Sequence, residues 1–225
     1  MTRRTTTKKE LTCSGLLLDN DGVLIDASNA IEYCWRTLAS LYNLPVDEVL
    51  AQVSGRRSRD VINSYAQMLP VTVDEALDQY EQICIEDTTS VQALPGAAEL
   101  LESLPANCWT VVTSGTRDLT RTRLEAAGLP VPSVLVTAED VTAGKPDPAP
   151  YKLAAERLGF LPKLCLAVED APPGLASARA AGCRTLALLT THKAEQLIGA
   201  DLYLPNLAHI QAHPGITGIQ LVITD

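Results

Sequence analysis

The sequence predicts an α/β fold: a doubly wound, mainly parallel, Rossmann-like sheet with an all-helical domain inserted after its first strand. Three observations predict it. A short apolar run at residues 15–18 stops at an acidic pair and a glycine, which is typical of a buried strand in a parallel sheet. No strand-like run interrupts residues 27–89, where apolar residues recur with helical spacing. From Pro95 onward strand-like and helix-like segments alternate, which indicates parallel strands joined by right-handed crossovers.

The inserted segment contains three predicted helices. They cover residues 29–43, 58–69 and 73–87. Thr72, with Glu75 three residues later, resembles the capping box that begins a helix. The connections to the rest of the chain, near residues 26–29 and 88–94, would act as hinges. An insertion tethered at both ends beside the ligand-binding edge of the sheet is well placed to be a lid.

The alternating segment completes the predicted core. Its strands cover residues 109–115, 134–137, 164–170 and 185–189, with a candidate edge strand at 202–204. Its helices cover residues 95–104, 117–127, 150–158 and 174–181. Glycine follows three of these helices, as expected for the left-handed residue that often ends a helix. The predicted domains are a disordered tail at residues 1–11, an α/β core at 12–27 and 93–225, and a helical cap at 28–92.

Composition and charge exclude several classes of partner. The 225 residues carry 18 Lys and Arg against 27 Asp and Glu, a formal net charge of −9, so neither nucleic acid nor an anionic membrane is an expected partner. The basic, Thr-rich start lacks the apolar stretch of a secretory signal, and no run is long enough to span a bilayer. Six cysteines without C-x-x-C spacing fit reduced thiols. We expect a cytoplasmic protein, either a monomer or a weak homodimer.

Polar residues follow the ends of four predicted core strands. They are Asp19 and Asp21, Ser114 and Gly115, Lys145, and Glu169 and Asp170. Each group alone is a common turn, loop or helix-capping pattern. In a parallel sheet, however, the carboxyl ends of the strands share one edge, where ligands bind. The coincidence at four strand ends therefore favours a single functional site.

These residue types together favour phosphoryl transfer. Crowded carboxylates repel one another without a cation, and carboxylate oxygens in the absence of His or Cys indicate Mg²⁺. Lys145, the Ser114 hydroxyl and the Gly115 backbone N–H would stabilise the oxygens of a phosphoryl group. One aspartate can form an acyl phosphate, and the other can protonate the leaving oxygen and then activate water. The second role requires a raised pKa, which a closing cap that excludes water would provide.

The four groups also match, in order, the motifs of a known family. The matching motifs are Asp19-Asn20-Asp21-Gly22, Ser114 after an apolar strand, Gly144-Lys145-Pro146 and Glu169-Asp170. Across residues 12–210 the chain resembles the haloacid dehalogenase superfamily of Mg²⁺-dependent phosphotransferases, in the subgroup with a helical cap after the first strand. The resemblance implies Asp19 as the nucleophile and Asp21 as the general acid and base.

The resemblance also implies which residues hold the phosphate and the metal. The candidate phosphate ligands are Asn20 through its backbone N–H, Ser114, Gly115 and Lys145. The candidate metal ligands are Asp19, Asp21 through its backbone carbonyl, Glu169 and Asp170. Asn20 stands where such proteins commonly carry an apolar residue, and its side chain is expected to point away from the site.

Within the superfamily, the sequence run at 113–118 and the run from Gly144 to Tyr151 resemble sugar and polyol phosphatases of the 2-deoxyglucose-6-phosphate, hexitol-phosphate and glycerol-3-phosphate types. The resemblance implies hydrolysis of small phosphorylated sugars or polyols through an aspartyl-phosphate intermediate. In the cap, residues 54–58 resemble the substrate-specificity loop of these enzymes, and Arg57 aligns with an arginine there. A solvated arginine at the start of a helix is an equally good interpretation of Arg57.

Two alternatives remain open. A β-phosphoglucomutase-like enzyme would share the core and the cap. The mutases that resemble this chain, however, carry a histidine early in the first cap helix, at the position of Ile31. All three histidines of this chain come late in the sequence, so none lies in the cap. A receiver-like phospho-acceptor signalling module also gathers acids, a hydroxyl and a lysine at strand ends. Such a module would be shorter and would lack the helical insertion. The phosphatase interpretation is therefore favoured.

Overall fold

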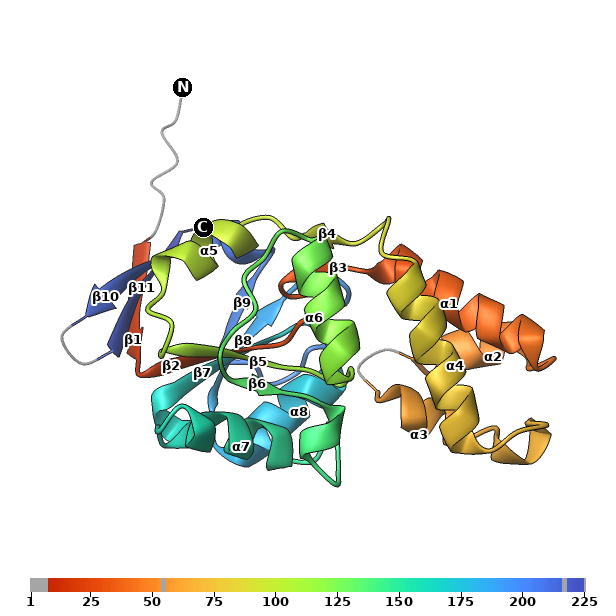
Figure 1. Ribbon diagram of the computed structural model, residues 1–225. Helices are drawn as coiled ribbons and strands as arrows, with labels where there is room; N and C mark the ends of the chain where they lie inside the picture. Colours follow the sequence, from red (N-terminus) through yellow and green to blue (C-terminus); the bar gives the residue numbers. More distant parts are fainter. Residues whose placement is uncertain (1–7, 54–55, 216–217, 225) are drawn as a thin grey trace.

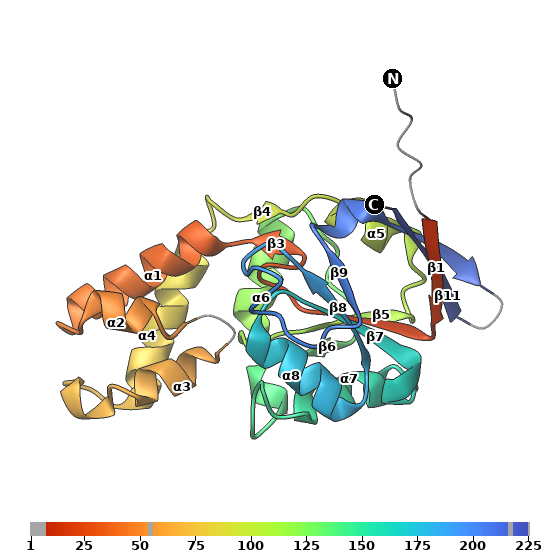
Figure 2. The same ribbon diagram turned by 180° about the vertical axis from the view of Figure 1, so that it is seen from behind.

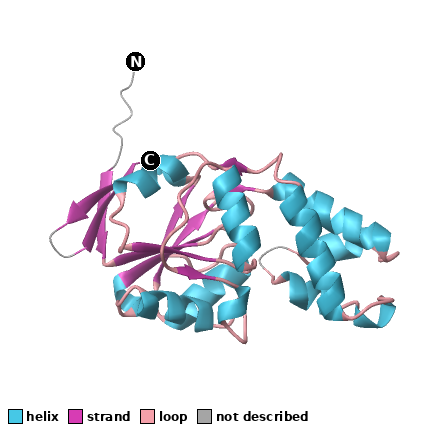
Figure 3. Ribbon diagram, in the orientation of Figure 1, coloured by secondary structure: helices cyan, strands magenta, loops and turns pink. Residues whose placement is uncertain are grey.

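The computed structural model describes residues 8–53, 56–215 and 218–224. The described chain has an α/β core and a separate block of helices at one end of it (Figure 1). Figure 3 shows the difference between the two parts: the block consists of helices, whereas strands run through the core. None of the described helices is long and apolar enough to cross a membrane.

The core is built on a six-stranded sheet whose strands all run parallel, in the order β6-β5-β2-β7-β8-β9. Its strands are β2 (Gly15–Leu18), β5 (Trp109–Val112), β6 (Leu135–Val136), β7 (Cys165–Glu169), β8 (Arg184–Leu188) and β9 (Leu202–Leu204). The predicted doubly wound, mainly parallel sheet is thus confirmed. β2 lies between β5 and β7, so the first predicted strand is one of the two central strands of the sheet.

Helices cover both faces of this sheet. They are α5 (Ala97–Ser103), α6 (Arg117–Ala126), α7 (Ala149–Arg157) and α8 (Pro172–Ala181). α5 and α6 lie on one face, and α7 and α8 lie side by side on the other (Figures 1 and 2). Because successive side chains of a strand point to opposite faces, Leu16 and Leu18 pack with α5 and α6, whereas Leu17 packs with α7 and α8. This two-sided burial explains why β2 is an unbroken apolar run.

The inserted cap has its own apolar core. Its helices are α1 (Ser28–Leu41), α2 (Val46–Leu50), α3 (Ser58–Asn63) and α4 (Val73–Glu86), with a 3₁₀ turn η1 (Ala66–Met68). Cys34, Trp35 and Leu38 of α1 are buried with Tyr80 of α4, and Leu119 of core helix α6 joins the same cluster. The Thr72–Glu75 capping box that begins α4 is present as predicted.

Two short antiparallel strands connect the cap to the core. They are β3 (Ile25–Asp26) and β4 (Gln92–Ala93). The entering and leaving chains therefore run side by side, close to the predicted hinge positions. The remaining 3₁₀ turns are η2 (Ala138–Asp140), η3 (Pro162–Leu164) and η4 (Leu207–His209).

A three-stranded antiparallel sheet corrects part of the expected disordered tail. Its strands are β1 (Lys8–Cys13), β11 (Gly218–Thr224) and β10 (Ile210–Gly215), with β11 in the middle. Residues 8–11 are thus ordered in β1, while residues 1–7 of the expected tail lie outside the described residues. Leu11 and Cys13 are buried, whereas Lys8 and Lys9 are exposed, so β1 is an amphipathic strand. Its backbone hydrogen bonds are made with β11, near the other end of the chain.

Candidate active site

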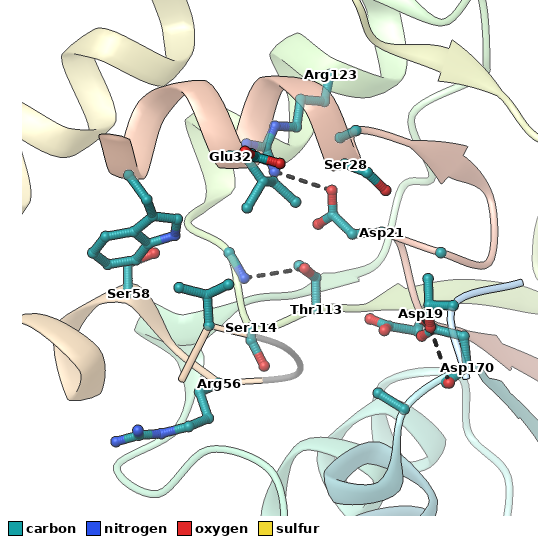
Figure 4. Close-up of a pocket in the computed structure, with 18 of the residues that line it drawn as sticks. Asp19, Asp21, Ser28, Glu32, Arg56, Ser58, Thr113, Ser114, Arg123 and Asp170 are labelled. Atoms are coloured by element: carbon teal, nitrogen blue, oxygen red, sulfur yellow. Dashed lines mark hydrogen bonds and ion pairs between the residues drawn. The ribbon is translucent and has the colours of Figure 1, made fainter. Parts of the chain in front are cut away.

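The candidate site lies where β2, β5 and β7 end together. Leu18 of β2 pairs with Val111 of β5 and with Val168 of β7, so the residues that follow these strands emerge at the same edge. A cavity of about 460 Å³ opens there, between the core and the cap. Figure 4 shows Asp19 and Asp170 together on one side of this cavity, with Arg56 and Ser58 of the cap on the other side.

Lys145 is buried behind the first aspartate. Its Nζ lies 2.8 Å from Asp19 Oδ1 and 2.6 Å from Glu169 Oε1, and it donates to the Val112 carbonyl at 3.0 Å. These three acceptors match the three N–H donors of an ammonium group. The Tyr151 hydroxyl donates to the same Glu169 Oε1 at 2.5 Å. Lys145 is therefore fixed in one position, where it holds one oxygen of Asp19.

Three buried acids lie around this lysine. One oxygen each of Asp19, Glu169 and Asp170 lies within 4.8 Å of the others. Burial, followed by the Glu169 charge, raises the pKa of Asp19 to about 7, although Lys145 opposes the shift. Burial, followed by the Asp19 charge, raises the pKa of Asp170 to about 7. Burial also raises the pKa of Glu169. One lysine therefore does not compensate the three carboxylates fully.

The acidic cluster fits a divalent cation. Oδ1 of Asp170 and Oε2 of Glu169 are buried and have no hydrogen-bond partner among the described residues. Buried acceptors without donors are costly, and a cation between them would satisfy both oxygens. The cluster offers carboxylate oxygens without thiolate or imidazole, the set that hard cations such as Mg²⁺ prefer. The Asp21 carboxylate is not part of this cluster.

Two glycines and a threonine fit closely around the acids. A Cβ on Gly174 would lie 2.0 Å from the Glu169 carboxylate, and a Cβ on Gly22 would lie 2.2 Å from Asp170 Oδ2. Gly22 also has a φ of 83°, which favours glycine. The Thr191 hydroxyl donates to Asp170 Oδ2. The sequence analysis did not single out Thr191. It follows strand β8, however, and residues that follow the strands of a parallel sheet are expected at the ligand-binding edge.

Asp21 points away from the acidic cluster and toward helix α6. Its Oδ1 accepts a hydrogen bond from Arg123 Nη1 at 3.0 Å (Figure 4). Arg123 was not among the residues that the sequence singled out, because an arginine within a helix gives no local signal of a site. The Asn20 side chain is buried and does not line the cavity, while its backbone carbonyl accepts the N–H groups of the following turn.

The remaining phosphate candidates also lie at the cavity. Ser114 and Gly115 line it directly. The Gly115 N–H donates to Thr113 Oγ1 at 3.1 Å, so a phosphate oxygen would have to replace this contact. Lys145 does not line the cavity and reaches it through Asp19.

Arg57, the candidate substrate residue of the cap, contacts an acid of the cap and two backbone carbonyls of the core. Its Nε and Nη2 bind the Asp60 carboxylate at 2.9 and 3.0 Å. Its Nη1 donates to the carbonyls of Thr142, at 3.1 Å, and Val141, at 3.4 Å, in the core. Arg57 and Ser58 line a second cavity of about 320 Å³, and Ser58 also lines the larger one together with Arg56. In this structure Arg57 ties the cap to the core.

Comparisons with known proteins agree with this architecture. A model of the haloacid dehalogenase-like hydrolase family matches residues 16–188. The chain is 38% identical over 201 residues to hexitol phosphatase A of Escherichia coli (strain K12), covering 88% of this chain and 93% of that protein. It is 34% identical over 204 residues to validoxylamine A 7'-phosphate phosphatase of Streptomyces hygroscopicus subsp. limoneus, covering 87% and 94%. A hydrolase from Pseudomonas syringae superposes with a TM-score of 0.76 at 25% identity, covering 87% of this chain and 94% of that one.

The matched region extends from β2 to the end of β8 and contains both the cap and the acidic cluster. It makes up well over half of the chain, and the alignments to the two phosphatases cover nearly the full length of each of those proteins. The resemblance that the four sequence motifs suggested is confirmed. The chain therefore belongs to the haloacid dehalogenase-like hydrolase family.

Proposed function

We propose that this protein is a Mg²⁺-dependent phosphatase that hydrolyses small phosphorylated sugars or polyols through an aspartyl-phosphate intermediate on Asp19. The observation that carries the proposal is the fixed Asp19 carboxylate. Lys145 holds its Oδ1 at 2.8 Å, at the wall of a cavity beneath the cap. A nucleophile held in this way loses little freedom when it reacts.

The reaction needs two steps at phosphorus. In the first, an Asp19 oxygen forms a bond to phosphorus while the bond to the sugar or polyol oxygen breaks, and Asp21 gives its proton to that oxygen. In the second, Asp21 takes a proton from water, which attacks the phosphorus of the aspartyl phosphate and releases inorganic phosphate and the Asp19 carboxylate. Ser114 and Gly115 line the space where the phosphoryl oxygens would lie.

Asp19, Glu169 and Asp170 would hold the metal ion, together with the backbone carbonyl of Asp21 that the family resemblance implies. When bound, Mg²⁺ would neutralise part of the charge of the acids and of the phosphoryl oxygens. Glu169 is fixed by Lys145 and Tyr151 and Asp170 by Thr191, so the chain holds these ligands in place by itself.

The shape and lining of the cavity support a sugar or polyol phosphate as substrate. A volume of about 460 Å³ lies within the range of small-molecule sites. The Trp35 and Tyr80 rings, with centroids 4.2 Å apart, form an apolar wall on the cap side. Polar side chains that could bind hydroxyl groups surround that wall. They are Ser28, Glu32, Arg56 and Ser58. One of the two phosphatase relatives is named for a hexitol and the other for validoxylamine A 7'-phosphate.

The mutase alternative has less support. The cavity is lined by Ile31, an apolar side chain, at the position where the mutases that resemble this chain carry a histidine. A cytoplasmic location is also part of the proposal, and it is supported by the six cysteines, all of which are free thiols.

An experiment on Asp19 tests the proposal. The unmodified protein with Mg²⁺ should release inorganic phosphate from a panel of hexose, deoxyhexose, hexitol and glycerol phosphates, and Asp19→Asn should abolish release. The matched control is Asp78→Asn, which changes an exposed aspartate of α4 and should leave turnover intact. Mass spectrometry of acid-quenched enzyme should detect one added phosphoryl group on the segment that contains Asp19. Normal turnover by Asp19→Asn would refute the mechanism.

A further inference from the structure

Arg123 is a buried cation at the junction of the core and the cap. It belongs to α6, the core helix that packs against cap helix α4, and its side chain is only 5% exposed. Leu119, one turn earlier on the same face, is part of the apolar cap cluster. An arginine in this position is unexpected, because an apolar side chain would fill the same space without the cost of burying a charge.

The hydrogen bonds of Arg123 are incomplete. Nη1 donates to Asp21 Oδ1 at 3.0 Å, while Nε and Nη2 are buried and have no partner among the described residues. A buried arginine with a purely structural role would normally have these donors satisfied. Arg123 lines the cavity together with Asp21, Glu32 and Tyr80, and Figure 4 shows its guanidinium directed toward Asp21. Arg123, the residue that carries these unpaired donors, is therefore part of the wall of the proposed substrate cavity.

Asp21 depends on this arginine for its position. The other oxygen of the carboxylate, Oδ2, has a weak contact to Asn20 Nδ2 at 3.5 Å, so the Arg123 bond is the stronger of the two. The Asp21 side chain is 30% exposed, so close packing covers only part of it. Without Arg123 the carboxylate would be free to turn toward solvent.

We propose that Arg123 is a positioning residue that holds the Asp21 carboxylate against the ester oxygen of the substrate, while its unpaired N–H groups bind hydroxyl groups next to that oxygen. The inference rests on the proposed function, because it assigns Asp21 the transfer of a proton to the leaving oxygen. It goes further by naming the residue that sets the geometry of this transfer. Misplacing an acid by about 1 Å is enough to lower its contribution strongly.

The leaving group provides the test. Alkoxide leaving groups of sugar and polyol phosphates need a proton from the enzyme, whereas p-nitrophenolate leaves without one. Arg123→Met should lower kcat/KM for a hexitol phosphate by about 100-fold, the typical contribution of a general acid. It should lower kcat/KM for p-nitrophenyl phosphate much less. The matched control is Arg121→Met, an exposed arginine two residues earlier on α6, which should change neither value.

A double-mutant cycle separates positioning from general support of the fold. If Arg123 acts on proton transfer through Asp21, the Asp21→Asn/Arg123→Met protein should have the same kcat with the hexitol phosphate as Asp21→Asn alone, while the loss of the contacts to the substrate hydroxyl groups raises its KM. Arg123→Lys should recover part of the lost kcat, because a lysine can contact one carboxylate oxygen. If Arg123→Met does not fold, as judged by its thermal unfolding, the same substrates and the same cycle are applied to Arg123→Lys.

Three results would overturn the proposal. Equal losses for the hexitol phosphate and p-nitrophenyl phosphate would make Arg123 a structural residue, as would additive effects on kcat in the cycle. Absence of phosphate release by the unmodified protein from every ester would overturn the proposed function and this inference together. If the unmodified protein turns over these substrates but Arg123→Met lowers kcat/KM equally for both leaving groups, this inference alone is overturned.

Discussion

Lys145 Nζ and Asp19 Oδ1 form a buried ion pair, 2.8 Å long, at the carboxyl edge of the central sheet. The same ammonium lies 2.6 Å from Glu169 Oε1, so one lysine holds a residue from each of two neighbouring strand ends. The pair joins fold and chemistry. It offsets the charge of acids that the sheet brings together, and it fixes the orientation of the Asp19 carboxylate.

We expect Lys145→Met to destabilise the metal-free protein strongly. The substitution keeps most of the side-chain volume but leaves Asp19 and Glu169 buried without their cation, and breaking a buried pair in this way costs about 3–5 kcal/mol. Urea unfolding at pH 8 in EDTA measures the loss. The matched control, Lys152→Met, removes an exposed lysine of α7 and should change the free energy of unfolding by less than about 0.5 kcal/mol. Similar values for the two variants would contradict the prediction.

We expect the metal-free protein to lose stability as the pH rises from 5 to 8. Burial and neighbouring carboxylates raise the pKa values of Asp19 and Asp170 from 3.8 to about 7. The folded state then binds protons more tightly than the unfolded chain, so stability is highest below the unfolded pKa and falls as the pH rises through the folded pKa. Each pKa unit corresponds to about 1.4 kcal/mol, enough to lower Tm by several degrees in a chain of this size. Thermal unfolding in EDTA measures the change.

Mg²⁺ should reverse this trend. A cation binds the ionised carboxylates, so Mg²⁺ should raise Tm more at pH 8 than at pH 5. Asp170→Asn should weaken both the fall in EDTA and the rise with Mg²⁺, while the exposed Asp78→Asn should behave like the unmodified protein. A Tm in EDTA that stays level or increases between pH 5 and pH 8 would show that the three acids are compensated without a metal.

Much of the core site could be predicted because its residues follow short apolar runs. The runs before Asp19, Ser114 and Asp170 are strands of one parallel sheet, and the geometry of such a sheet brings their ends together. This prediction uses only the local sequence pattern and the general rule that ligands bind at the carboxyl ends of parallel strands. It cannot identify site residues that lie within helices. Arg123 and Tyr151 lie on α6 and α7, where a polar side chain is ordinary until packing shows which way the helix faces.

The antiparallel sheet escaped prediction for a different reason. Ile219, Leu221 and Ile223 alternate with polar or half-buried residues, which is a strand pattern, but a strand is stable only beside a partner. β11 pairs with β10, which precedes it directly, but its other partner is β1, about 200 residues earlier in the chain. A short basic segment at the start reads as a tail when it is considered alone. The pairing is a property of the folded chain, not of either segment.

We expect Gly22→Ala to impair metal binding more than stability alone would suggest. A Cβ at this position would lie 2.2 Å from Asp170 Oδ2, so the carboxylate must move. Gly182→Ala is a close control, because its φ of 88° resembles the 83° of Gly22 while nothing lies within 4 Å of the added Cβ. Both substitutions strain the backbone, by about 1–2 kcal/mol. Titration of each protein with Mg²⁺, followed by the rise in Tm, should show weaker binding for Gly22→Ala only. Equal affinities would contradict the prediction.

We expect Arg57→Ala to slow the hydrolysis of sugar phosphates and aryl phosphates by similar factors. Its guanidinium contacts Asp60 and the carbonyls of Val141 and Thr142, so it links the cap to the core loop that leads to Lys145. Loss of the link should hinder cap closure for every substrate. Arg56→Ala, which changes a residue that lines the larger cavity, should affect the sugar phosphates more. The measurement is kcat/KM of each variant for one hexitol phosphate and for p-nitrophenyl phosphate. A selective loss of sugar-phosphate turnover in Arg57→Ala would instead support the substrate contact that the sequence suggested, because Arg57 would then have to release Asp60 and turn into the cavity when substrate binds.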